Sequence, residues 1–176
     1  MRVKFAKLPL YLGMVVLFFS VLVAVIQLNQ KSPVLLTRSS ANVSTAVMAL
    51  SPAEGKYSKD QEVDMGVTFS ADEFITGADV VISFNPENIE IDESRVAPGN
   101  LFSLAYVQAD REEGKMTATL ISKNKQGEKS GILLRFKFVG ETGGVSRMEF
   151  DRDTKLIDTK GNELSTDFKM SQITFK

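Results

Sequence analysis

The chain has 176 residues, with 21 basic and 22 acidic side chains, no histidine and no cysteine. The lack of cysteine excludes disulfides and thiolate metal sites, and the lack of histidine removes the commonest general base and zinc ligand. Three basic residues and no acidic one lie before Asn29, so the remainder carries 18 basic and 22 acidic side chains. This mild acidity argues against a nucleic-acid partner, which usually requires a basic face. We expect neither a metal nor a cofactor.

The first part of the chain predicts a membrane anchor. No charged side chain occurs between Leu8 and Leu28. A helix over this run, at about 1.5 Å per residue, would span roughly the 30 Å hydrocarbon layer of a bilayer. We therefore expect one transmembrane signal-anchor helix over residues 8–28, whose apolar side chains include Leu8, Val15, Phe18, Val21, Val25 and Leu28.

Basic residues on one side of this run set its expected direction. Arg2, Lys4 and Lys7 precede the run, whereas the first acidic residue is Glu54. The positive-inside rule then places residues 1–7 in the cytoplasm and everything after the helix outside the cell. We expect a single-pass protein of the cell membrane with an extracellular C-terminal domain.

A cleaved secretory signal is the alternative interpretation of the same segment. Such signals also start with basic residues, but their apolar stretch is about 7–15 residues long and ends near a small-residue cleavage site. The run here is longer, and the nearest cluster of small residues, 44–46, lies well downstream. We therefore prefer an uncleaved anchor, and either interpretation exports the rest of the chain.

The chain changes character after the apolar run and again at residue 45. Residues 29–44 are polar and rich in serine, with one short apolar interruption, and they predict a flexible stalk. Apolar and polar residues then alternate with the period of a half-buried strand over residues 63–69, 78–84 and 116–120. The most apolar run, 132–139, predicts a central strand.

Turn signals separate these runs and indicate the fold class. Pairs such as Asn85-Pro86, Pro98-Gly99 and Gln126-Gly127 recur roughly every 10–15 residues. No stretch between them has helical periodicity long enough for a crossover, and residues 87–93 are compatible with either a helical turn or a strand. We therefore predict one all-β domain over residues 45–176, an antiparallel sandwich.

Four stretches follow one another along this part of the chain: GADVVISFNPENIEI (77–91), PGNLF (98–102), GILLRFKF (131–138) and DTKGNEL (158–164). Taken in order, they resemble the cohesin domain, the module that binds dockerins in cellulosome scaffolds. The resemblance implies a jelly-roll sandwich of about nine strands with no catalytic role. Asn85 stands where the family usually has Asp, a mild change because both residues cap turns.

The resemblance also implies where a protein partner would bind. In dockerin-binding members the docking surface is the flat outer face of one sheet, and Asp79 matches a polar position on a strand of that face. The alternation agrees, because Asp79 and Ser83 point away from the apolar row of their strand. We expect Asp79, Val81 and Ser83 to contact the partner, although Gly77 stands where those members can carry Asn. On the neighbouring strand, the same alternation predicts that Leu120 points inward.

Sugar binding is the main rival interpretation, because carbohydrate-binding modules share this sandwich architecture. Exposed aromatic rings usually carry flat glycan binding. The exported part has no Trp, and its only tyrosines are Tyr57 and Tyr106. These two are therefore the expected contacts to a polysaccharide. A structural envelope or filament subunit is the third interpretation.

Acidic residues in the chain predict neither catalysis nor a metal site. Asp92 and Glu93 are neighbours in sequence, so on a strand they face opposite sides rather than each other across a pocket. Residues 151–155 begin like a calcium loop, but Lys155 occupies a position that needs an oxygen ligand. We expect a non-catalytic, membrane-anchored recognition module that binds a dockerin-type or other envelope protein in polysaccharide-related surface assembly.

Overall fold

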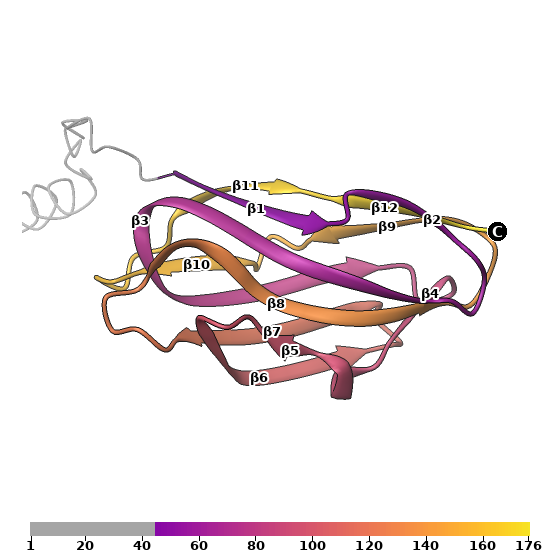
Figure 1. Ribbon diagram of the computed structural model, residues 1–176, viewed down its shortest axis with the longest axis horizontal. Helices are drawn as coiled ribbons and strands as arrows, with labels where there is room; N and C mark the ends of the chain where they lie inside the picture. Colours follow the sequence, from indigo (N-terminus) through magenta and orange to yellow (C-terminus); the bar gives the residue numbers. More distant parts are fainter. Residues whose placement is uncertain (1–44) are drawn as a thin grey trace, which may run out of the picture. The chain divides into compact units, whose positions relative to one another are not determined.

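The computed structural model describes residues 45–176, which form strands and one 3₁₀ turn, η2 (Glu93–Arg95) (Figure 1). The strands are β1 (Thr45–Ser51), β2 (Glu54–Tyr57), β3 (Glu62–Phe84), β4 (Ile89–Ile91), β5 (Ala97–Pro98), β6 (Phe102–Asp110), β7 (Lys115–Ser122), β8 (Glu128–Gly140), β9 (Gly144–Phe150), β10 (Lys155–Asp158), β11 (Ser165–Lys169) and β12 (Ser171–Phe175). The predicted membrane helix over residues 8–28 and the predicted stalk over residues 29–44 lie outside the described residues. Within residues 45–176, no helix is long and apolar enough to cross a membrane.

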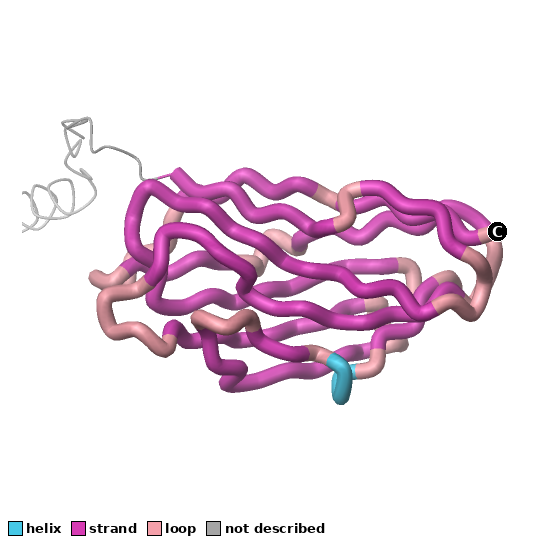
Figure 2. Tube along the Cα trace, in the orientation of Figure 1, coloured by secondary structure: helices cyan, strands magenta, loops and turns pink. Residues whose placement is uncertain are grey.

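The long strand β3 connects two layers of the sandwich. Its first half pairs with β1 and β8, and its second half pairs with β7 and β10. The register against β8 shifts between Ser70 and Ile75, where the strand bends (Figure 2). Layer 1 contains β11, β1, the first half of β3, β8, β4 and β5, and layer 2 contains β10, the second half of β3, β7 and β6. β9 continues layer 2, because it pairs with the end of β3, and β12 and β2 follow it in the order β9-β12-β2.

Alternating side chains of both layers form one core. The runs that predicted half-buried strands bury their apolar rows: Val63, Met65, Val67 and Phe69 in layer 1, and Ala78, Val80, Ile82, Phe84, Met116, Ala118 and Leu120 in layer 2. The rings of Phe69 and Phe102 meet edge to face, with centroids 5.7 Å apart. Because Phe69 lies in layer 1 and Phe102 lies in layer 2, this contact ties the layers together.

The PGNLF stretch is explained by a close backbone approach at Gly99. The Gly99 N–H donates to the Leu133 carbonyl at 2.7 Å. A Cβ at Gly99 would overlap the carbonyl oxygen of Ile132, so only glycine fits there. The contact holds the loop after β5 against β8, and the chain then enters β6 with Phe102 fully buried.

The strand arrangement differs from the sequence prediction in two respects. Residues 45–176 form twelve strands rather than about nine, partly because the first and last strands of the sandwich are each interrupted. Runs 63–69 and 78–84, in contrast, belong to one continuous strand. The sandwich is also not wholly antiparallel, since β11 runs parallel to β1 and β12 runs parallel to β2. The last two strands of the domain therefore lie beside β1 and β2 and run in the same direction. Residues 87–93, for which two structures were open, contain β4 and lead into η2.

Candidate functional site

The outer face of layer 2 carries the residues predicted to contact a partner. The even-numbered residues of β3 from 78 to 84 are buried, so Asp79, Val81 and Ser83 point to the other side of the sheet. Leu120 of β7 is 1% exposed, which confirms its predicted inward direction. Local alternation thus placed these side chains on the correct sides of the sheet.

Strand register aligns four side chains across this face. Asp79 lies opposite Lys155 of β10 on one side and Thr119 of β7 on the other, and Thr119 lies opposite Tyr106 of β6. The Thr119 hydroxyl donates to Asp79 Oδ1 at 2.8 Å. This hydrogen bond holds the Asp79 carboxylate toward β7. We call these four residues the Asp79 row.

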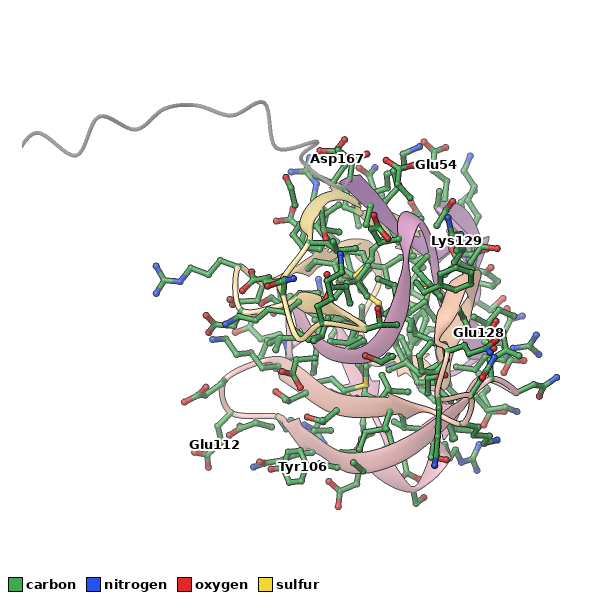
Figure 3. The ribbon with its side chains drawn as sticks, turned by 90° about the vertical axis from the view of Figure 1, so that its left-hand side faces the viewer. Glu54, Tyr106, Glu112, Glu128, Lys129 and Asp167 are labelled. Atoms are coloured by element: carbon green, nitrogen blue, oxygen red, sulfur yellow. The ribbon has the colours of Figure 1, made fainter. Side chains whose placement is uncertain are left out.

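Ile121 is a feature of this face that the sequence analysis missed. Its side chain is 55% exposed and lies opposite Gly77 on β3 and Ser103 on β6. Because neither neighbour has a large side chain, Ile121 stands clear of the sheet. The alternation that turns Leu120 inward already implied an outward Ile121, so the signal was present in the sequence. Tyr106, which is labelled in Figure 3, is 49% exposed. Tyr106 and Ile121 together give the face an apolar part.

Val81 has little surface to offer a partner, because it is only 8% exposed. The turn between β9 and β10 brings Thr154 against this part of β3. Thr154 Oγ1 accepts a hydrogen bond from the Val81 N–H at 3.0 Å and donates to the Val81 carbonyl at 2.9 Å. Thr154 therefore occupies the place of a neighbouring strand, and of the three predicted contacts Val81 is the least accessible.

Ser83 belongs to a polar corner at one end of the face. Its hydroxyl donates to Asp151 Oδ2 at 3.4 Å, and Lys115 Nζ lies 3.4 Å from the same oxygen. A hydrogen bond from the Asp153 N–H, followed by the charge of Lys115, holds the pKa of Asp151 below its usual value. The corner therefore keeps an ionised carboxylate beside Ser83.

The two predicted glycan contacts do not come together. Tyr57 lies on β2, which pairs with β12, and its ring packs against the core. Tyr106 lies on β6, which pairs with β7, and its hydroxyl is hydrogen-bonded to the Gln108 side chain. Since β2 and β6 neither pair with each other nor share a neighbouring strand, the two rings form no common aromatic platform.

Asp92 and Glu93 line an open groove of about 480 Å³, to which two basic residues that pair with Glu62 also contribute. Asp92 accepts hydrogen bonds from the Ser94 hydroxyl at 2.7 Å and the Ser94 N–H at 2.9 Å, which lower the pKa of Asp92. Glu93 Oε2 accepts from the Ala109 N–H at 3.3 Å. Both carboxylates thus bond to the protein itself.

The hairpin after β10 is closed by Asp158. Its carboxylate accepts hydrogen bonds from the N–H groups of Lys160 and Asn162, at 2.7 and 2.8 Å, and from the Asn162 amide at 3.0 Å. Bonding to Asn162 lowers the pKa of Asp158. Across residues 45–176, no group of three acidic residues lies close enough to hold a metal ion.

No protein-family model and no curated protein matches the chain. Solved structures do match it. A type II cohesin domain from the cellulosome of Acetivibrio cellulolyticus superposes with a TM-score of 0.60 at 13% identity, covering 74% of this chain and 95% of that one. The fold is cohesin-like. This confirms the resemblance expected from the four sequence motifs.

Two further structures extend the comparison. A non-cellulosomal cohesin from the hyperthermophilic archaeon Archaeoglobus fulgidus matches with a TM-score of 0.59 at 12% identity, covering 76% of this chain and 91% of that one. A chain of the type I cohesin–dockerin complex Coh-OlpA–Doc918 from Clostridium thermocellum matches with a TM-score of 0.60 at 13% identity, covering 75% and 99%. The cohesin-like domain therefore corresponds to nearly the whole of each of these chains.

Proposed function

We propose that the chain is a non-catalytic, membrane-anchored extracellular receptor that binds a dockerin-type protein through the outer face of layer 2. The observation that carries the proposal is the Asp79 row with Ile121 exposed beside it. The complex of Coh-OlpA with Doc918 pairs a domain of similar fold with a dockerin, which supports this class of partner.

The chemistry of the face suits a protein partner. Protein interfaces usually have a few apolar or aromatic anchors at their centre, with oriented polar groups around them. Ile121 and Tyr106 provide the apolar surface, and Asp79 provides a hydrogen-bond acceptor. Because Thr119 already orients the Asp79 carboxylate, little side-chain entropy would be lost when a partner donates to it.

The apolar run over residues 8–28 supports the anchored part of the proposal. A helix of this length would hold the cohesin-like domain at the outer surface of the cell membrane. Tethering raises the effective concentration of a bound partner at that surface. A dockerin-bearing partner would bring polysaccharide-related assembly to the cell envelope.

The test is calorimetric titration of the full chain in detergent micelles with a panel of dockerins in calcium. We expect saturable heat with at least one dockerin. We also expect Asp79→Lys and Ile121→Asp each to weaken binding at least tenfold, since one changes the half-buried polar group at the centre of the face and the other its exposed apolar group. Asp64→Lys is the matched control. Asp64 lies on the first half of the same strand, with its side chain 80% exposed, and the variant makes the same change of charge in layer 1.

Glycan binding is the second candidate, favoured by the exposure of Tyr106 on the same face. The same titration would be repeated with soluble glucans and other cell-wall or plant glycans. If no dockerin gives binding heat, and a glycan binds in a way that Tyr106→Ala abolishes, glycan binding would become the better account. If neither class of ligand gives binding heat, a structural envelope subunit would be favoured.

A further inference from the structure

β11 forms a free edge of layer 1. Among residues 45–176 it pairs with no strand other than β1, and the backbone groups on its outer side have no backbone partner there. Phe168 within the strand is 40% exposed, and Met170 directly after it is 53% exposed. An exposed edge with apolar side chains is a template for pairing with another strand.

The side chains of β11 separate into an apolar side and a charged side. Phe168 lies opposite the fully buried Met48 of β1, so it is on the core side of the sheet, and its ring centroid is 5.2 Å from that of Phe150. Asp167 and Lys169 lie on the outer side, one on each side of Phe168 in sequence. The edge therefore carries two opposite charges, two residues apart, on its outer side. An exposed ring lies between them in sequence but on the core side.

We propose that β11 pairs antiparallel with β11 of a second copy of this chain, about a twofold axis at Phe168. This register places Asp167 opposite Lys169 of the second copy, and the symmetry forms the same pair again. The two Phe168 rings lie opposite each other on the core side, and Thr166 lies opposite Met170 of the second copy. Opposite charges and aromatic pairs that face each other across antiparallel strands are stabilising.

Charge selects this register from its neighbours. Directly opposed residues in a sheet share a face. The register can therefore shift only in steps that keep the core sides of both strands on the same face. Centring the axis on Asp167 would bring two carboxylates together, and centring it on Lys169 would bring two ammonium groups together. Only the axis at Phe168 forms two attractive pairs. The edge is thus self-complementary, as a twofold interface requires.

A short strand edge makes a weak interface. Five residues bury less than the roughly 800 Å² per partner of a standard stable complex, so we expect reversible dimers rather than a permanent one. β11 belongs to layer 1, whereas the Asp79 row lies in layer 2. Dimerisation would therefore leave both candidate docking faces open, and it does not depend on whether they bind a dockerin.

Sedimentation equilibrium of the full chain in detergent micelles, over a range of concentrations, tests the proposal. We expect the wild type to self-associate. Asp167→Lys and Lys169→Asp should each weaken association roughly tenfold, because each turns two exposed attractive pairs into two repulsive ones. The double exchange, Asp167→Lys with Lys169→Asp, restores opposite charges and should restore association.

Lys125→Asp provides the control, because it makes the same charge change as Lys169→Asp in the exposed turn between β7 and β8. It should leave association unchanged. A wild-type chain that stays monomeric at every concentration would overturn the proposal. So would association that the single reversals do not weaken, or that the double exchange does not restore, since the contact would then lie elsewhere.

Discussion

Two buried serines on the paired strands β9 and β12 differ in their hydrogen bonding. The Ser171 hydroxyl donates to the Pro52 carbonyl at 2.6 Å. The Ser146 hydroxyl is, within residues 45–176, the only buried side-chain polar group without a partner. Burying an unpaired hydroxyl costs free energy, whereas removing a paired one leaves its acceptor unsatisfied.

We therefore expect Ser146→Ala to raise the free energy of unfolding by about 1 kcal/mol and Ser171→Ala to lower it by about 1–2 kcal/mol. Urea unfolding followed by circular dichroism measures both. Each variant is the other's control, because the same atom is removed from two neighbouring buried sites. An equal loss of stability in both variants would show that the Ser146 hydroxyl contributes to the fold.

At the scale of elements, the turn between β9 and β10 completes the edge of β3 with a side chain. The Thr154 hydroxyl bonds both backbone groups of Val81, and the side chain is 3% exposed. Thr154→Val keeps the shape but leaves the Val81 N–H and carbonyl without this partner. We expect a loss of about 1–3 kcal/mol of stability and faster hydrogen exchange at the Val81 amide.

Thr154→Ser retains the hydroxyl and should keep the protection of that amide. Hydrogen exchange followed by NMR reads the Val81 amide directly, so it separates the loss of this bond from a general loss of stability. Unchanged protection in Thr154→Val would mean that other contacts hold the edge of β3.

At the scale of the whole molecule, the proposed anchor would hold the cohesin-like domain at the cell membrane. Cells expressing the full chain should retain it in the membrane fraction after an alkaline wash, and detergent should release it, because an apolar run of about 20 residues inserts stably. Removal of residues 1–28 should move the chain to the soluble fraction. Recovery of a mature chain that lacks residues 1–40 would instead favour a cleaved signal.

Local patterns in the sequence were enough to predict the class of fold and the direction of many side chains. The period-2 alternation put Asp79 and Ser83 outside and Leu120 inside, because successive residues of any strand face opposite sides. The PGNLF stretch was identified by its resemblance to a family segment, and the structure supplies the physical reason, a backbone contact at Gly99 that no other residue fits. The same alternation also predicts that Ile121, next to the inward Leu120, points outward.

Contacts between distant parts of the chain decided what the alternation could not. The hydrogen bond of Thr119 to Asp79 joins residues 40 positions apart, and that of Thr154 to Val81 joins residues 73 positions apart. A period of two shows which side a residue faces but not which strand lies beside it or in what register. The parallel pairing of β11 with β1, the free edge of β11 and the burial of Val81 therefore emerged only when the strands were assembled.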